Sequence, residues 1–259
     1  MDRPVLSPSF EITPLLGKVI LITGAAKRIG EAIARRLHAD GARVAIHTRH
    51  SVLAANRLAE TLNAIRPKSA IVVTADLVEP NAAARVVAEV LSCYERLDGL
   101  VNNASSFFPT PIGSIDLDAW NDLVGSNFMA PLFLSQAAAP FLQKTKGAIV
   151  NITDIHAERP LRNYPLYCAA KGALLALTRS LAVELGPQVR VNAVAPGAIL
   201  WPENKAFDRS ERQAIVAHTL LEREGSPEDI ARAVQFLFLN APYITGQVIN
   251  VDGGRTAHL

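Results

Sequence analysis

The segment at residues 19–37 constrains the fold of this chain more than any other feature. An apolar run, Val-Ile-Leu-Ile at 19–22, leads directly into Thr-Gly-Ala-Ala-Lys-Arg-Ile-Gly at 23–30, and apolar residues then recur with helical spacing. This order predicts a strand, a tight turn and a helix. Such a turn gathers backbone N–H groups and a helix N-terminus at one point, where they can bind the pyrophosphate of a dinucleotide. An ordinary strand-to-helix turn is the alternative, since a glycine-rich match alone is a weak signal.

The glycine pattern of this turn is altered at its middle position. Gly24 and Gly30 are retained, but the position at which a small residue normally lets the cofactor approach the backbone is Arg28. Lys27 precedes this arginine and Ile29 follows it. Two cations therefore lie where an anion is expected, and we assign all five residues to cofactor binding.

The rest of the chain alternates short apolar runs with segments of helical periodicity. Strands are predicted at residues 19–22, 43–47, 70–74, 100–102, 148–152, 190–193 and 247–251, and helices at 29–39, 52–65, 81–94, 117–142, 166–185 and 227–239. This alternation predicts an α/β fold, a doubly wound parallel sheet of seven strands with helices on both faces. We expect residues 1–14 to form a flexible arm and residues 15–259 a single Rossmann-type domain. Ligands of such sheets bind beyond the carboxyl ends of the strands.

Composition argues against several other classes of protein. The formal net charge is +2 and no stripe of Lys and Arg is present, so we do not expect a nucleic-acid partner. Cys93 and Cys168 lack metal or redox spacing and the six histidines are scattered, which argues against a metal site and favours a reducing cytoplasm. No apolar run reaches the roughly 18 residues that span a bilayer, so no membrane segment is expected.

The residues after the second predicted strand indicate which dinucleotide binds. An NAD-binding fold usually places a carboxylate there for the ribose hydroxyls, but this chain has Arg49, His50 and Ser51. An arginine can bind a phosphate through two hydrogen bonds, so this segment predicts NADPH rather than NADH, unless these are only solvated loop residues. After the third strand, Asp76 and Leu77 are placed to meet the adenine, although such an aspartate is equally often a capping residue.

Tyr167 and Lys171 are the strongest catalytic candidates. They stand four residues apart on a predicted helix and so share one face, about one turn apart. A phenol with a pKa near 10 is a poor proton shuttle at neutral pH, and a neighbouring cation lowers that pKa by stabilising the phenolate. A Tyr-x-x-x-Lys pair is common on surface helices, but here it follows a dinucleotide-type turn within one α/β sheet.

Together these motifs resemble the short-chain dehydrogenase/reductase family. The matching segments are Thr-Gly-(x)5-Gly at 23–30, Asn-Asn-Ala at 102–104, Asn127, Tyr-x-x-x-Lys at 167–171, Arg-Val-Asn-Ala-Val-Ala-Pro-Gly at 190–197 and Val-Asp-Gly-Gly at 251–254. The resemblance covers nearly all of the chain after Gly17 and implies nicotinamide-dependent hydride transfer. It implies that Tyr167 supplies a proton, that Lys171 holds the nicotinamide ribose and lowers the tyrosine pKa, and that Asn127 supports a water-mediated proton relay to Lys171. Residues implied to lie beside the cofactor are Asn102, Asn103, Ala104, Ser105, Pro196 and Gly197. The family usually forms homotetramers.

Departures from the common family pattern point to one branch of it. Asp154 stands where most members carry a catalytic serine, thirteen residues before Tyr167, and Arg28 replaces the middle glycine of the turn. With Asn-Asn-Ala-Ser-Ser-Phe-Phe-Pro-Thr-Pro at 102–111, these features resemble the pteridine reductases. That resemblance implies that Phe107 stacks on a pterin opposite the nicotinamide and that Ser105 binds substrate and cofactor. It also implies that Arg28 reaches both the cofactor phosphate and the pterin.

This narrower resemblance predicts NADPH-dependent reduction of a pterin. A flat heterocycle with a polar rim needs a stacking face and surrounding donors and acceptors, which Phe107, Ser105 and Arg28 can supply. A carboxyl partly removed from water tends to hold its proton, so Asp154 could keep Tyr167 protonated. The alternatives are that Asp154 only caps a loop and that Phe107 is a core aromatic.

Two residues of the C-terminal third are further candidates. Trp201 lies on a loop after a predicted strand and is expected to contact the substrate. Arg255 follows the terminal Asp-Gly-Gly, and by the resemblance it approaches the site of a neighbouring subunit.

Two other functions stay open at this point. A different substrate within the family, such as a 3-oxoacyl thioester or a sugar or steroid carbonyl, leaves Arg28 and Asp154 unexplained. A non-enzymatic NADPH-binding sensor has no need for the complete set of Asn127, Tyr167 and Lys171.

Overall fold

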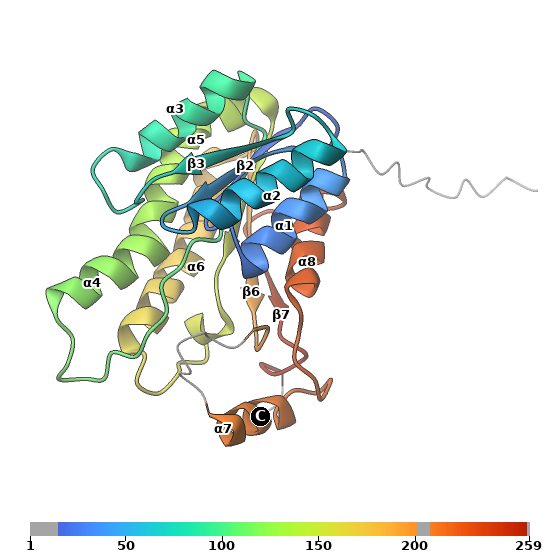
Figure 1. Ribbon diagram of the computed structural model, residues 1–259. Helices are drawn as coiled ribbons and strands as arrows, with labels where there is room; N and C mark the ends of the chain where they lie inside the picture. Colours follow the sequence, from blue (N-terminus) through green and yellow to red (C-terminus); the bar gives the residue numbers. More distant parts are fainter. Residues whose placement is uncertain (1–14, 201–207, 258–259) are drawn as a thin grey trace, which may run out of the picture.

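A seven-stranded parallel sheet forms the centre of the molecule. The computed structural model describes residues 15–200 and 208–257, so the predicted arm at 1–14 and Trp201 lie outside the described residues. The sheet order is β3-β2-β1-β4-β5-β6-β7, with helices on both faces (Figure 1). The strands are β1 (Val19–Ile22), β2 (Arg43–Thr48), β3 (Ala70–Thr74), β4 (Gly99–Asn102), β5 (Ala148–Ile152), β6 (Arg190–Pro196) and β7 (Val248–Val251). The predicted fold class is confirmed, and the largest difference at a strand end is the continuation of β6 to Pro196.

Two layers of helices cover the two faces of the sheet. The main helices are α1 (Arg28–Ala39), α2 (Val52–Ile65), α3 (Ala82–Tyr94), α5 (Ala130–Thr145), α6 (Pro165–Leu185) and α8 (Pro227–Leu239). Successive strand residues point to opposite faces, so Ile20 and Ile22 join the core beneath α1, α2 and α8. Val19 and Leu21 join the core beneath α3, α5 and α6. All four side chains are buried, which explains why β1 is an uninterrupted apolar run.

The helix predicted over residues 117–142 is interrupted in the structure. A short helix, α4 (Leu117–Val124), is followed by a π-helical turn, η1 (Gly125–Met129), and then by α5. The prediction of one regular helix was therefore wrong. A π turn inserts one residue into the helical repeat, and turns of this kind occur frequently at functional sites.

Helix α7 (Arg209–Ala217) was not predicted from the sequence. None of its residues is buried, and its apolar residues stand together at 214–217 instead of recurring along the helix. A capping box at Asp208 and Glu211 marks its start instead: the Asp208 carboxylate accepts the Glu211 N–H at 2.8 Å, and the Glu211 carboxylate accepts the Asp208 N–H at 2.7 Å.

One described helix, α6, is long and apolar enough to cross a bilayer by length and composition alone. Half of its apolar window is buried inside the fold, where Leu185 joins the core below the sheet and Leu166 joins the cluster around Tyr167. Its apolar character is accounted for by this packing.

Candidate active site

The turn after β1 is one in which side chains have no room. Gly24 has φ of 60°, and a Cβ added to it would lie 2.9 Å from the Ala104 Cα. A Cβ added to Gly30 would overlap the carbonyl oxygen of Gly24. Only hydrogen fits at these two positions, so the retained glycines follow from the close packing of the turn.

Two side chains hold this turn in place. His47 Nδ1 accepts the Gly24 N–H at 3.3 Å, and His47 Nε2 donates to the Ala75 carbonyl at 3.1 Å. Burial lowers the pKa of His47 to about 4, so the ring is neutral at pH 7 and keeps one nitrogen able to accept. Asn103 Nδ2 donates to the carbonyl oxygens of Thr23 at 2.9 Å and Gly24 at 3.1 Å. Sequence analysis did not single out His47, because its importance arises from this contact.

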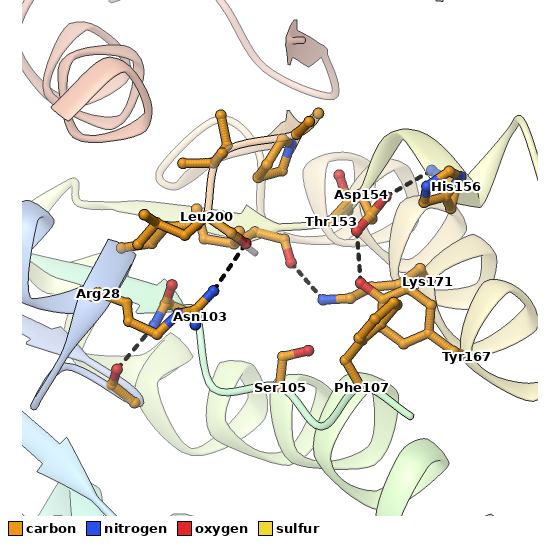
Figure 2. A pocket seen from close by; sticks show the side chains of 18 of the residues that line it. Arg28, Asn103, Ser105, Phe107, Thr153, Asp154, His156, Tyr167, Lys171 and Leu200 are labelled. Carbon is orange, nitrogen blue, oxygen red and sulfur yellow. Dashed lines mark hydrogen bonds between the residues drawn. The ribbon is translucent and has the colours of Figure 1, made fainter. Parts of the chain in front are cut away.

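Arg28 adopts a backbone conformation that favours glycine. Its φ is 56°, and this left-handed region costs a residue with a side chain about 1–2 kcal/mol. The side chain reaches across the cavity, where Nη2 donates to the Leu200 carbonyl at 3.0 Å (Figure 2). An arginine kept at a strained position on a cavity wall favours a role for the guanidinium itself.

A cavity of about 630 Å³ opens beside this turn, at the carboxyl ends of the strands. Most of the residues predicted from the sequence line it: Gly24, Lys27, Arg28, Ile29, Gly30, Ser51, Asn103, Ala104, Ser105, Phe107, Asp154, Tyr167, Lys171, Pro196 and Gly197. Its volume is in the range of small-molecule sites. Lys27 and Arg28 stand at the start of α1, and the single carboxylate in the described lining, Asp154, follows β5 instead. The turn therefore fits the phosphates of a dinucleotide.

Several predicted residues lie outside the described lining of this cavity. They are Arg49, His50, Asp76, Leu77 and Asn127. Arg49 Nη1 lies between two carboxylates, 3.8 Å from Asp76 Oδ2 and 3.5 Å from Asp122 Oδ1. A phosphate bound here would compete with the Asp76 and Asp122 carboxylates for the Arg49 guanidinium.

Asn102 does not lie beside the cofactor site, and that expectation was wrong. Its side chain is buried in the sheet, where Nδ2 donates to Asn151 Oδ1 at 2.8 Å. Asn151 in turn donates to Thr178 Oγ1 on α6 at 2.9 Å. The strand alternation turns Asn102 inward, so the next two residues, Asn103 and Ala104, form the cavity wall.

Asp154 uses its two carboxylate oxygens for two different partners. Oδ1 accepts the His156 N–H at 2.8 Å and caps the short 3-10 turn η2 (Ile155–Ala157). Oδ2 accepts the Tyr167 hydroxyl at 2.7 Å (Figure 2). The loop-capping and the chemical interpretation of this residue are thus geometrically compatible.

Tyr167 is held as a neutral donor. Burial raises its pKa well above 10, and the charge and hydrogen bond of Asp154 raise it further. The expected lowering by Lys171 does not occur in this structure, because Lys171 Nζ donates to the Ile152 carbonyl at 2.9 Å and lies 5.8 Å from the centre of the phenol ring. Burial lowers the pKa of Lys171 to about 8, which leaves the ammonium mostly protonated at pH 7.

The π turn η1 brings Asn127 beneath the cavity wall. Ser105 Oγ donates to Asn127 Oδ1 at 2.7 Å, and Asn127 Nδ2 donates to the carbonyl oxygens of Ser106 at 2.9 Å and Leu123 at 3.0 Å. Asn127 therefore positions Ser105, while its relay to Lys171 stays a prediction.

Phe107 is fixed by two tyrosine rings. It stacks on Tyr164 with centroids 4.6 Å apart and meets the edge of Tyr167 at 4.8 Å. Phe107 also lines the cavity, so an aromatic ring held in place by two others is part of its wall.

The described lining also contains residues with no predicted part in the site. His156 lies beside Asp154 (Figure 2), with its Nδ1 bonded to the Arg159 carbonyl at 2.8 Å. Arg255, expected to approach a neighbouring subunit, lines the cavity of its own chain. The sequence pointed neither to His156 nor to a place for Arg255 in its own chain's cavity, because the sheet order brings η2 and the segment after β7 there. The fold and this site define a dinucleotide-dependent oxidoreductase.

Comparison with known proteins gives the family. A family model described as enoyl-(acyl carrier protein) reductase matches residues 24–256. Pteridine reductase 1 of Leishmania tarentolae is 42% identical, covering 91% of this chain and 95% of its own length. The 3-oxoacyl-[acyl-carrier-protein] reductase of a Synechocystis species is 33% identical, covering 94% and 98%. A crystal structure of a blue fluorescent protein from a metagenomic library, in complex with NADPH, matches with a TM-score of 0.88 and 36% identity over 93% of this chain and 99% of that one. This chain belongs to the short-chain dehydrogenase/reductase family.

Proposed function

We propose that this protein reduces a pterin, dihydropterin to tetrahydropterin, with NADPH. The observation that carries the proposal is the pairing of Asp154 with Tyr167, whose oxygens lie 2.7 Å apart on the cavity wall. A carbonyl substrate offers only an acceptor oxygen. A hydroxyl can donate a hydrogen bond to this oxygen, whereas an ionised carboxylate cannot. A pterin offers ring N–H and amino donors as well as acceptors, so it can use Asp154 and Arg28 together.

The cofactor of this oxidoreductase is NADPH. Lys27 and Arg28 at the turn, and Arg49, His50 and Ser51 after β2, offer cations and donors for its phosphates, including the 2′-phosphate. When bound, NADPH supplies the hydride.

Tyr167 and Asp154 supply the proton in this proposal. The 2.7 Å separation of the phenol oxygen and Asp154 Oδ2 suits a hydrogen bond in either direction. The Asp154 carboxylate accepts the Tyr167 hydroxyl and orients it. Tyr167 gives its proton to the ring nitrogen next to the reduced carbon, and a proton from solvent restores the phenol. Lys171 keeps its ammonium beside the Ile152 carbonyl, within reach of the ribose.

Three side chains position the pterin ring in this proposal. The Phe107 ring stacks on it, the Ser105 hydroxyl contacts its rim, and Arg28 donates to its acceptors. Each of them is held by the protein itself: Phe107 by Tyr164, Ser105 by Asn127 and Arg28 by the Leu200 carbonyl.

We also propose that the protein acts as a homotetramer in the cytoplasm. Apolar side chains exposed on α4, α5 and α6, those of Trp120, Phe133 and Val183, support assembly because oligomers bury such surface. Light scattering on the protein as it elutes from a size-exclusion column is expected to give four times the monomer mass.

The experiment that tests the pterin proposal is NADPH oxidation with a panel of substrates. The panel holds dihydrobiopterin or dihydromonapterin, quinonoid dihydropterin, dihydrofolate and an acetoacetyl thioester. We expect turnover of the dihydropterins with NADPH and much weaker turnover with NADH. Activity confined to the thioester would refute the pterin proposal, and no turnover with any substrate would favour a sensor.

A further inference from the structure

Arg255 lines the cavity from the segment after β7, four strands away from the dinucleotide turn after β1. It follows β7, the edge strand of the sheet, whereas Lys27 follows β1 and Ser51 follows β2. All three line one cavity, which runs along the carboxyl edge of the sheet. A dinucleotide that extends from β2 towards β6 leaves Arg255 beyond the nicotinamide, on the substrate side.

The guanidinium of Arg255 is partly buried and has no partner among the residues that the structure describes. Within residues 15–200 and 208–257 its side chain makes no ion pair within 4.0 Å and no hydrogen bond. Burial lowers the pKa of Arg255, while the charges of Asp154 and Asp252 raise it, so it stays a cation. A cation removed from water is costly unless an acceptor comes to it.

The turn that carries Arg255 is rigid before any ligand arrives. Asp252 Oδ1 accepts the Gly254 N–H at 2.9 Å, and Oδ2 accepts the Thr256 N–H at 2.8 Å and the Thr256 hydroxyl at 2.7 Å. Both oxygens are therefore used within the turn. Arg159 Nη2 adds a bond to the Thr256 carbonyl at 3.4 Å. The backbone that carries Arg255 is therefore held in place, so only the side chain has to be ordered when an anion binds.

Asp154 does not take the place of that anion. It is the single carboxylate in the described lining, and its oxygens accept from His156 and Tyr167. The charge of Asp154 raises the pKa of Arg255, but the two side chains are farther apart than the 4.0 Å limit of an ion pair. Asp154 and Arg255 therefore line the same cavity without forming an ion pair.

We propose that Arg255 forms an anion subsite for the side chain of the substrate. The protein then prefers pterins whose side chain carries a carboxylate or a phosphate over neutral pterins. A guanidinium can donate two parallel hydrogen bonds to either group. This inference rests on the proposed function, because the stacked ring decides where the side chain points.

The test compares neutral and anionic substrates in one set of variants. Steady-state kinetics with NADPH are measured for 7,8-dihydroneopterin, its 3′-monophosphate and 7,8-dihydrofolate, using wild type, Arg255→Gln and Arg255→Lys. Arg232→Gln is the matched control, since Arg232 is an exposed arginine of α8 that pairs with Glu228. We expect Arg255→Gln to raise KM for an anionic substrate by about tenfold or more, with Arg255→Lys restoring part of the loss. The neutral substrate and the control should change by less than about twofold.

The pattern of losses identifies the ligand and decides the proposal. A loss limited to the monophosphate assigns a phosphate, and a loss limited to dihydrofolate assigns a carboxylate. Equal losses for neutral and anionic substrates, or none, would overturn the subsite while leaving pterin reduction intact. Absence of pterin reduction in wild type would remove the proposed function and the subsite together. Thermal unfolding and NADPH affinity of Arg255→Gln check that the variant is folded.

Discussion

Asp154→Asn separates the two tasks of this carboxylate. Asparagine keeps an oxygen that can accept the His156 N–H, whereas Asp154→Ala loses both the cap and the partner of Tyr167. Losing the cap costs about 0.5–2 kcal/mol, and leaving the buried hydroxyl unpaired costs about 1–3 kcal/mol. Asp154→Ala should therefore lower the free energy of unfolding by about 2–5 kcal/mol, and Asp154→Asn by about 1 kcal/mol.

Both variants should lose the carboxylate that orients the Tyr167 hydroxyl for proton transfer. General acid catalysis contributes about 10²–10⁴ in rate, or about 3–5 kcal/mol of barrier. We expect kcat with a dihydropterin to fall at least about 100-fold in both, despite their different stabilities. NADPH affinity should change by less than about twofold, because Asp154 lies on the substrate side of Tyr167.

Three measurements check this account of Asp154. The absorbance of reduced nicotinamide gives kcat, its fluorescence gives the NADPH affinity, and urea titration gives the stability. In Asp154→Asn the pKa of Tyr167 should fall, because a negative charge and its hydrogen bond are removed while burial persists. Wild-type kcat in Asp154→Asn would refute the chemical role. A loss of activity limited to Asp154→Ala, in step with its stability, would leave Asp154 as a loop cap alone.

Three further changes test other parts of the site. Arg28→Gly relieves the strain of a φ of 56°, worth about 1–2 kcal/mol, and adds about 1 kcal/mol of conformational entropy cost on folding. The free energy of unfolding in urea should therefore be unchanged or higher, while KM for dihydropterin rises. Unaltered pterin kinetics would contradict this role of Arg28. Tyr167→Phe should lower kcat at least about 100-fold with NADPH binding retained, and near-normal turnover would exclude the hydroxyl from proton transfer. His47 has its pKa lowered from 6.5 to about 4, so the unfolded chain binds a proton first as the pH falls, and the stability contributed by the neutral ring is lost between about pH 6.5 and 4. Urea unfolding should therefore lose about 2 kcal/mol more between pH 7 and 5 in wild type than in His47→Asn, and equal pH dependence would contradict the assignment.

The sheet could be predicted because a strand buried on both faces consists of an uninterrupted run of apolar residues. Val19 to Ile22 are all apolar since each faces one of two helix layers. The break at Gly125 left no comparable mark, because a π turn adds one residue without changing the apolar composition. Helix α7 is short, and its apolar residues stand together in its second half, at 214–217, so its sequence does not show the repeated apolar spacing of a longer helix.

Site residues could be predicted from the sequence where local geometry fixes the spacing between them. Gly24, Gly30 and the Tyr-x-x-x-Lys pair were found by spacing because turn geometry and helical repeat fix their positions. Contacts between segments that are far apart in the chain could not be predicted from the sequence. His47 meets Gly24 and Arg255 reaches the cavity because of strand order, and the Lys171 ammonium bonds a carbonyl rather than acting on the phenol.

The ratio of kcat/KM for a dihydropterin to that for an acetoacetyl thioester, both with NADPH, tests the central claim most directly. It is measured in wild type and in the double variant Arg28→Gly, Asp154→Ser, which restores the residues common in the family. We predict that wild type favours the dihydropterin by about 100-fold or more and that the double variant loses most of this preference. A wild-type preference for the thioester, or a ratio unchanged by the double substitution, would contradict the account.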